Sequence, residues 1–347
     1  MAADPHSDLE AEGVLNPASG RTADGRLWLL PRLVASGNVS RVGLAEVLVE
    51  HGRPAAVRRA GVVLAPDTGW ERSHRTAGVE DPRSTWIPTL NLHVMSYVAF
   101  GPLGPKPALA VSKDLVHWRR LGPLHFEYQP DLDTDLNLFP NKDVVFFPEP
   151  LPGPNGQPCY AVLHRPMWDL GWILGGTDLY LPAGLDDARP GIWISYIPVD
   201  DVHRDVGALT HLRSHRLVAL PRFDWEAVKI GAGPPPIRVP DGWLLIHHGV
   251  SGALSTGWAP QREVHYAAGA MLLDPDDPAQ VIARTDTPLL APETTEEQVG
   301  TVANVVFPTA IEEIDGHRFV FYGMADSSIG VARLDVTTQD PSTPEAP

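Results

Sequence analysis

The chain has 347 residues, with 27 Lys and Arg against 43 Asp and Glu, which gives a formal net charge of −16. So acidic a chain is a poor binder of nucleic acid, whose phosphates need a cationic face, and of anionic membrane surfaces. The 36 Pro and 31 Gly residues interrupt helices and favour turns, so they indicate many short strands.

Cysteine content and the ends of the chain bear on its compartment. Cys159 is the only cysteine, so no intrachain disulfide can form and a reducing compartment is expected. The N-terminal sequence MAADPHSDLEAEGVL lacks the basic start and apolar run of a signal peptide, and no segment approaches the roughly 20 apolar residues that span a bilayer. We therefore expect a cytoplasmic protein. Residues 1–12 and 336–347 lack apolar periodicity and are expected to be peripheral and loosely attached.

Turn signals and short strands alternate along the chain. Four dipeptides typical of hairpin turns are Asp24-Gly25, Asn155-Gly156, Asp241-Gly242 and Asp315-Gly316. Each precedes an apolar strand, and a fifth strand lacks the dipeptide; the five span residues 26–32, 90–101, 157–165, 243–249 and 317–323. Another segment precedes each strand, at residues 15–20, 79–86, 141–149, 231–239 and 304–310, and further strands recur at 108–118, 191–202 and 329–335. Amphipathic helices are scarce, because residues 46–51 and 294–299 form only short candidates.

The strands form an imperfect repeat. The polar residues that align near the ends of the five strands are Arg32, Tyr97, Arg165, His248 and Tyr322, separated by 65, 68, 83 and 74 residues. A unit of three or four strands taken five times predicts an all-β chain folded as a five-bladed β-propeller. We expect residues 13–335 to form this single catalytic domain. An irregular β-sandwich is the alternative, but it offers no reason for the five-fold repetition.

The strongest local signal for chemistry is Glu80-Asp81-Pro82-Arg83. Pro82 disfavours a helical backbone at the preceding residue, so Asp81 is expected to be extended. Asp81 could then serve as a general acid or a sugar ligand. Alternatively, its carboxylate could pair with Arg83 in a turn.

Other polar residues have two interpretations each. Residues 231–237, GAGPPPI, follow Lys229, but the three prolines lack the N–H donors of an anion-binding loop, which favours a rigid backbone. Lys229 would supply positive charge or lie on the solvated surface. His247 and His248 alternate on a strand, so one faces a neighbouring sheet and the other an open face. An inward Arg165 would need a carboxylate or phosphate partner. No metal-ligand spacing is present, so no metal is expected.

The motifs in order resemble glycoside hydrolase family 130. They are LNPASG, a strand ending in Arg32, GVEDPR, NKDVVFFPE, LHRP, KIGAGPPPI, HHGV, YAAGAMLLD, NVVFPTA and YGMAD, which together span nearly the whole chain. The family contains β-mannoside phosphorylases and some β-mannosidases, all five-bladed propellers. The resemblance therefore implies cleavage of a β-mannoside, such as mannobiose, a mannooligosaccharide or mannosyl-glucose.

The resemblance also implies a role for each matching residue. Asp81 would be the catalytic acid, acting through the mannose 3-hydroxyl. Phosphate would be bound by Lys142, Arg165, Lys229, His248 and Tyr266, while Asn16, Arg32, Arg83 and Asp326 would hold the mannosyl unit. Inorganic phosphate would be a co-substrate, no cofactor would be needed, and α-D-mannose 1-phosphate would form with inversion. Retention of the basic residues favours phosphorolysis over hydrolysis, and a non-catalytic sugar-binding propeller is a further alternative.

Some positions depart from the family pattern. His247-His248-Gly249-Val250 stands where Tyr-His-Gly-Val is common, and Tyr266-Ala267 where Tyr-Arg is common. Residues 167–191 form an insertion in which Trp168, Trp172 and Tyr180 would either stack an acceptor sugar or cover a blade edge. Family members often assemble, so a homo-oligomer is compatible with the resemblance. The sequence predicts a basic cluster beside Asp81 within an acidic protein.

Overall fold

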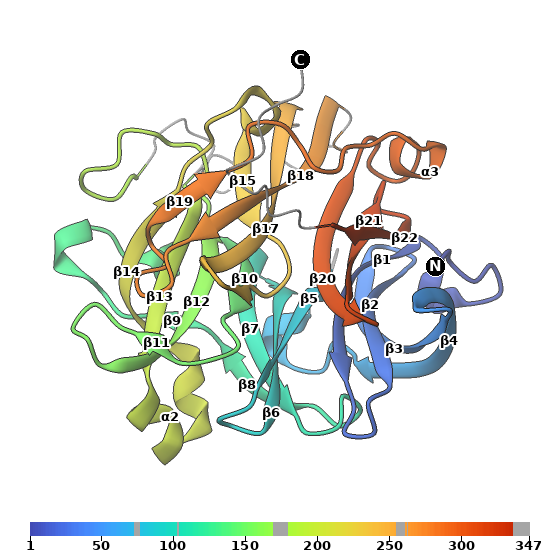
Figure 1. Cartoon of the computed structure of the whole chain (residues 1–347), viewed down its shortest axis with the longest axis horizontal. Helices are drawn as coiled ribbons and strands as arrows, with labels where there is room; N and C mark the ends of the chain where they lie inside the picture. Colours follow the sequence, from blue (N-terminus) through green and yellow to red (C-terminus); the bar gives the residue numbers. More distant parts are fainter. Residues whose placement is uncertain (73–76, 103, 169–179, 255–260, 262, 336–347) are drawn as a thin grey trace, which may run out of the picture.

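The structure, a computed structural model, describes residues 1–72, 77–102, 104–168, 180–254, 261 and 263–335. Within this part, strands dominate and the helices are short, which confirms the prediction of an all-β chain. The described strands form four hydrogen-bonded sheets, and we divide the eight-stranded first sheet into two groups at a short parallel pairing. The resulting five groups in chain order are here called units 1 to 5, and Figure 1 shows them side by side from blue to red.

The strands of unit 1 are β1 (Gly13–Arg21), β2 (Leu27–Ala35), β3 (Val39–Glu50) and β4 (Arg53–Leu64). Those of unit 2 are β5 (Ala77–Ile87), β6 (Leu92–Gly101), β7 (Gly104–Ser112) and β8 (Arg119–Pro123). Those of unit 3 are β9 (His125–Phe126), β10 (Asn141–Phe146), β11 (Leu151–Pro152), β12 (Pro158–Pro166), β13 (Ile192–Pro198) and β14 (His211–Ala219). Those of unit 4 are β15 (Lys229–Ala232), β16 (Ile237–Val239), β17 (Gly242–Ala253), β18 (Glu263–Leu273) and β19 (Val281–Arg284). Those of unit 5 are β20 (Val306–Ile314), β21 (His317–Met324) and β22 (Ser328–Leu334).

Two α-helices and six 3-10 helices accompany the strands. They are α2 (Val199–Arg204), α3 (Thr295–Gln298), η1 (Asp8–Glu10), η2 (Gly69–Glu71), η3 (Pro130–Leu132), η4 (Leu136–Leu138), η5 (Val206–Thr210) and η6 (Asp224–Glu226), all within the described residues. Of the two short helix candidates in the sequence, residues 294–299 contain α3, whereas residues 46–51 lie largely in β3.

The turn dipeptides connect strands as predicted. Asp315 and Gly316 join β20 to β21 with φ angles of 48° and 77°, which suit a tight hairpin turn. Nearly all strand pairs are antiparallel. The exceptions are two short parallel pairings, one between β3 and β5 that links units 1 and 2, and one between β9 and β14.

Strands are counted here in their order across the sheet, so that β10 is the first strand of unit 3 and β19 the fourth of unit 4. In this order, burial decreases from the first to the last strand of a unit. In unit 1, β1 is buried along nearly its whole length, whereas β4 is exposed at most positions. In unit 2, β5 is buried at all but one position, and β8 is mainly exposed or half-buried. The first strands therefore lie in the interior of the molecule, and polar residues on them are held in fixed, poorly solvated positions.

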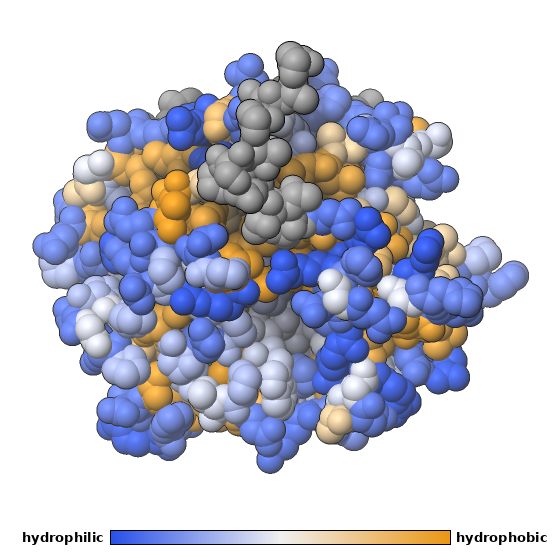
Figure 2. Space-filling view, viewed as in Figure 1, coloured by the Kyte–Doolittle hydropathy of each residue, from blue (hydrophilic) through white to orange (hydrophobic). Residues whose placement is uncertain are grey.

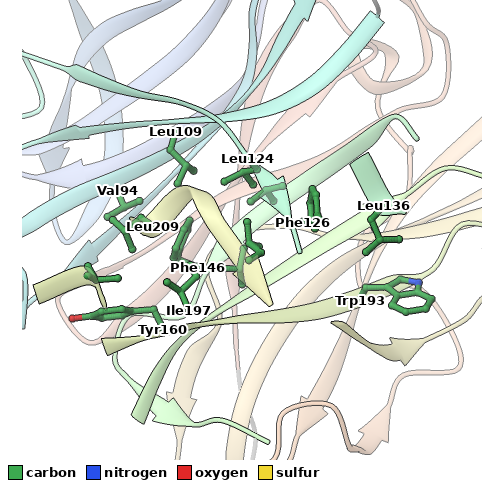
Figure 3. Close-up of a cluster of buried hydrophobic side chains, with 14 of the residues drawn as sticks. Val94, Leu109, Leu124, Phe126, Leu136, Phe146, Tyr160, Trp193, Ile197 and Leu209 are labelled. Carbon is green, nitrogen blue, oxygen red and sulfur yellow. The ribbon is translucent and has the colours of Figure 1, made fainter. Parts of the chain in front are cut away.

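Six hydrophobic clusters within the described residues join the units, two of them between unit 5 and unit 1. Four of them lie between consecutive units, and the cluster between units 2 and 3 is drawn in Figure 3. Strand alternation lets β10 serve two clusters, because Val144 and Phe146 face unit 2 whereas Val145 and Phe147 face unit 4. The fifth cluster contains Leu29 of β2 and Phe321 of β21, so unit 5 packs against unit 1. In Figure 1 β20 correspondingly lies near β1.

A buried glutamate recurs in the short 3-10 helix before the first strand of a unit. Its partner is an arginine of the unit's fourth strand. The pairs are Glu10–Arg59 at 2.7 Å, Glu71–Arg120 at 2.8 Å and Glu226–Arg284 at 2.6 Å. This contact fastens the outer strand to the start of the inner one.

The same glutamates correct the alignment of the repeat. The Tyr97 and Tyr322 hydroxyls donate to Glu71 and to Glu297 of α3. The corresponding contact to Glu226 in unit 4 is made by His247, not by the aligned residue His248. The sequence alignment was therefore wrong by one residue in this unit.

The N-terminal segment is attached firmly, so the prediction that residues 1–12 are loose was wrong. The Met1 ammonium donates to the Ile329 carbonyl oxygen at 2.6 Å, and Glu10 is buried. The other terminal segment, 336–347, lies outside the described residues. None of the described helices is long and apolar enough to cross a membrane. Figure 2 shows a face on which hydrophilic residues predominate, with hydrophobic residues visible between them.

Candidate active site

A pocket of about 550 Å³ opens where residues of all five units converge. We call it the main pocket. Eight of the ten site residues predicted from the sequence line it: Asn16, Arg32, Asp81, Lys142, Arg165, Lys229, Tyr266 and Asp326. The predicted basic residues Lys142, Arg165 and Lys229 therefore do converge with Asp81.

Irregularities in the first strands aim polar side chains into this pocket. The pairing register shifts next to Asn16 in β1, Asp81 in β5 and Asp143 in β10. These residues have φ angles of 44°, 47° and 56°, in the left-handed region that Asn and Asp tolerate best among residues with a side chain. The prediction of an extended Asp81 was wrong, because the bulge turns its carboxylate out of the regular alternation.

One side of the main pocket surrounds Asp81 with donors. Its Oδ1 accepts from Asn16 Nδ2 at 2.8 Å and from Arg32 Nη1 at 3.1 Å, and Arg32 Nη2 also donates to Glu80 at 2.9 Å. Burial opposes ionisation of Asp81, but Arg32 and Lys142 outweigh it and hold the pKa of the carboxyl below its ordinary value. In the empty pocket Asp81 is therefore an anion.

Asp326 behaves in the opposite way. It lies in the turn between β21 and β22 with a φ of 49°. Burial raises the pKa of its carboxyl to about 6, with Arg32 opposing the shift and the negative charge of Asp81 adding to it. The two carboxyl groups share one pocket and one arginine, so they titrate as an interacting pair.

The other side of the main pocket is cationic. Lys142 Nζ lies 3.9 Å from Glu80, and Arg165 Nη1 is buried without a hydrogen-bond partner among the described residues. Lys229 Nζ lies 5.5 Å from the centre of the Tyr266 ring, and burial together with the Arg165 charge lowers the pKa of Lys229 to about 7. An unpartnered guanidinium nitrogen and a poorly solvated lysine favour an anionic ligand here.

Asp143 organises this cationic side, and the sequence analysis did not single it out. Its Oδ2 accepts from Arg165 Nε at 2.5 Å, and its Oδ1 accepts from Arg83 Nη2 at 3.1 Å. The neighbouring arginines hold the pKa of Asp143 far below its usual range although the side chain is buried. A β-carbon on Gly231 would lie 2.1 Å from Asp143 Oδ2, so this part of GAGPPPI needs glycine for close approach. An acid inside the apolar run NKDVVFF was the signal that could have found it.

Arg83 and His248 lie behind the main pocket rather than in its lining. Arg83 donates to the carbonyl oxygens of Gly233 at 2.9 Å, Ala232 at 3.1 Å and Asp81 at 3.4 Å. Its guanidinium forms an ion pair with the carboxylate of Asp143, not with that of Asp81. The His248 ring is fully buried, with Nε2 3.5 Å from Asp143 Oδ2. Burial lowers the pKa of His248 well below its ordinary value, so the ring is neutral. Both residues therefore support the lining from beneath.

Of the two predicted alternatives for Trp168, burial rules out stacking on an acceptor sugar. Trp168 is fully buried against Phe139 and Trp193, at ring distances of 5.1 and 5.8 Å. Trp172 lies outside the described residues, and Tyr180 is exposed. Among the residues that the structure describes, no cluster of His, Cys, Asp and Glu could hold a metal ion.

Comparison with known proteins places this site in a family. The profile of a family described as beta-1,4-mannooligosaccharide phosphorylase matches residues 25–338. A 1,2-beta-oligomannan phosphorylase of Thermoanaerobacter sp. (strain X514) is 34% identical over 77% of this chain and 71% of its own length. A beta-1,2-mannobiose phosphorylase of the same organism is 34% identical over 74% of this chain and 67% of its own.

A solved structure shares the fold. The beta-1,2-mannobiose phosphorylase of Listeria innocua, in complex with beta-1,2-mannobiose, superposes with a TM-score of 0.67 at 22% sequence identity. The superposition covers 93% of this chain and 89% of that one.

Proposed function

The chain belongs to glycoside hydrolase family 130, and we propose that it cleaves a β-mannoside with inorganic phosphate. The products are α-D-mannose 1-phosphate, formed with inversion, and a shortened acceptor. The observation that carries the proposal is the cationic side of the main pocket, where Arg165 Nη1 lacks a partner among the described residues and Lys229 is poorly solvated. The names of the relatives agree with it.

The fold proposed with this function is a five-bladed β-propeller spanning residues 13–335. Five mainly antiparallel units, a hydrophobic cluster between each pair of neighbouring units and the packing of unit 5 on unit 1 support it. The main pocket would then lie where the first strands converge on the central axis.

Phosphate is a nucleophile that is already charged, so its attack needs no general base. The pocket has to hold the anion in line with the anomeric carbon and protonate the leaving oxygen. Arg165 can offer two parallel N–H donors to phosphate oxygens, and Lys142 and Lys229 add point charges. Tyr266 completes this side, while His248 and Arg83 brace it from beneath through Asp143.

Asp81 is the proposed acid, and its proton has to arrive with the ligands. Arg32 and Lys142 keep the carboxylate ionised in the empty pocket. A phosphate anion beside Lys142 offsets one of these cations, so phosphate binding raises the pKa of Asp81 and promotes its protonation. The proton would then pass through the mannose 3-hydroxyl to the glycosidic oxygen. Asn16, Arg32 and Asp326 hold the mannosyl unit on this side of the pocket.

Hydrolysis by an inverting β-mannosidase is the second candidate. Asp326 favours it, because a carboxyl group with a pKa of about 6 in the same pocket as Asp81 could activate water. Arg165 and Lys229 favour phosphorolysis, because a water molecule does not need two cations.

The test is incubation of the full chain with β-1,2-mannobiose, β-1,4-mannobiose and 4-O-β-mannosyl-glucose, each with and without phosphate. We expect phosphate-dependent formation of α-D-mannose 1-phosphate, detected by phosphorus NMR. Free mannose released at the same rate without phosphate would establish the hydrolase instead. Sugar binding without any product would leave a non-catalytic protein. Pretreatment with a chelator should not change the rate, because the proposed mechanism uses no metal.

A further inference from the structure

A second pocket, of about 670 Å³, lies at the other ends of the same first strands. We call it the far pocket. On β5 the main pocket is lined by Asp81 and the far pocket by Ser84 to Trp86, and on β20 the corresponding residues are Phe307 and Glu312. A strand rises about 3.3 Å per residue, so five residues separate the pockets by roughly 16 Å along β20. They are separate sites.

Trp86 gives the far pocket an aromatic surface. Its side chain is 40% exposed, although a ring of this size is usually largely buried. The ring packs at 4.7 Å from the buried ring of His93, which holds it in place. Burial lowers the pKa of His93 to about 4, so this support is uncharged at neutral pH. A braced, half-exposed indole can stack on an apolar face of a ligand.

Two buried polar atoms at the far pocket lack partners. Ser84 Oγ and His93 Nδ1 make no hydrogen bond within the described part of the chain, and their side chains are only 6% and 3% exposed. Buried polar groups are normally satisfied, so each such atom needs an explanation. A ligand hydroxyl can donate to His93 Nδ1 and exchange a hydrogen bond with Ser84 Oγ.

Among the described residues, the far pocket has one ion pair and one further cation, Lys113, whose side chain is exposed and therefore solvated. Arg21 Nε lies 3.3 Å from the Glu312 carboxylate, which also accepts from Ser19 Oγ at 2.6 Å. Lys113 and Asn91 complete the polar lining. The paired Arg21 and Glu312 differ from the main pocket, where Arg165 retains an unpartnered nitrogen, so this lining favours a neutral ligand rich in hydroxyl groups.

We propose that the far pocket binds a neutral saccharide, with one pyranose ring stacked on Trp86 and its hydroxyls bonded to Ser84, His93 and the Arg21–Glu312 pair. Only the choice of a mannooligosaccharide as the probe rests on the proposed function. A longer saccharide bound in the far pocket is held at a point remote from the bond that is cleaved. The saccharide therefore stays close to the enzyme, and its effective concentration at the main pocket rises.

Calorimetric titration with β-mannotetraose in the absence of phosphate tests the proposal. We expect two binding events per wild-type chain. Arg32→Ala damages the main pocket and should remove only one of them. Trp86→Ala should remove or weaken the other by roughly tenfold, and Ser84→Ala should weaken that same event by roughly fivefold. Tyr128→Ala is the control, because Tyr128 is an exposed aromatic residue that lines neither pocket.

The outcomes are distinguishable. The proposal would be overturned if Trp86→Ala still showed two binding events of unchanged affinity. It would also be overturned if wild type showed a single binding event and Arg32→Ala removed it. Competition of inorganic phosphate for the Trp86-dependent event would also overturn it, because the ligand would then be an anion. If Trp86→Ala does not fold, Ser84→Ala and Trp86→Phe provide the same test. Because saccharide binding to the far pocket needs no phosphorolysis, the two proposals can fail separately. A protein that shows no turnover but keeps the Trp86-dependent binding event would refute only the proposed function.

Discussion

Replacing Asp143 with Asn tests whether one carboxylate holds the cationic side of the main pocket together. The side chain is 3% exposed and pairs with Arg165 at 2.5 Å and Arg83 at 3.1 Å. Removing one partner of a buried ion pair costs about 3–5 kcal/mol, because the other charge stays buried. Arg83 keeps three carbonyl acceptors, and the Asn oxygen keeps one acceptor site, so we expect the lower end, about 3 kcal/mol of unfolding free energy.

Urea unfolding of wild type and Asp143→Asn measures this loss. Asp187→Asn is the matched control, because Asp187 pairs with Arg189 on the surface and its loss should change stability by less than about 1 kcal/mol. Added phosphate should stabilise Asp143→Asn more than wild type, since an anion in the main pocket compensates the unpaired Arg165. A loss below about 1 kcal/mol, or equal stabilisation of both proteins by phosphate, would refute the reasoning.

Three further predictions concern the main pocket. Asp81→Asn should lower kcat by about 10²–10⁴-fold while leaving the circular dichroism spectrum unchanged; steady-state kinetics that show near wild-type turnover would refute its role as the acid. Lys229 has a pKa of about 7 when folded against an ordinary 10.5, so the unfolded chain binds the extra proton between these values and stability should rise with pH there. Because Lys229 loses its positive charge as pH rises above 7, phosphate affinity should fall over the same range. Lys229→Met should raise the KM for phosphate and remove this pH dependence. If the KM of the variant still rises with pH, another group causes the dependence. Gly231→Ala should lower the free energy of unfolding, measured with urea, by about 1–3 kcal/mol, because the new β-carbon would lie 2.1 Å from Asp143 Oδ2. Gly69→Ala is the control and should be neutral, because no atom lies within 4 Å of its β-carbon. Equal effects of the two changes would contradict the packing argument.

The sequence predicted the fold better than the orientation of side chains. Turn dipeptides such as Asp315-Gly316 and period-two apolar runs depend on local backbone chemistry, so the strands were found. Bulges do not show in such patterns, and they decide which way Asp81 and Asp143 point. The one-residue error at His248 has the same origin, because alternation alone does not say which of two adjacent histidines meets the buried Glu226.

The family resemblance identified eight residues of the lining and two that support it, Arg83 and His248, but not the ion pairs that fasten the strands. Lining residues such as Arg165 form part of recognisable motifs. Glu226 and Arg284 lie far apart in the sequence and meet only after the fourth strand returns to the start of the unit. The sequence left two alternatives for Trp168 for a related reason, since an aromatic residue in an insertion can pack inward as readily as it can stack on a sugar.

The net charge of −16 does not conflict with an anionic co-substrate, because surface charges and the charges inside the main pocket act over different ranges. Surface charges are screened over about 8 Å at physiological ionic strength. Inside the main pocket little solvent intervenes, and the nearest charges are those of Lys142, Arg165 and Lys229. Asp143 offsets part of this positive charge, so the pocket can stabilise an incoming phosphate without a large excess of buried cations. Local pairing, not the total charge, therefore determines which ligands this site accepts.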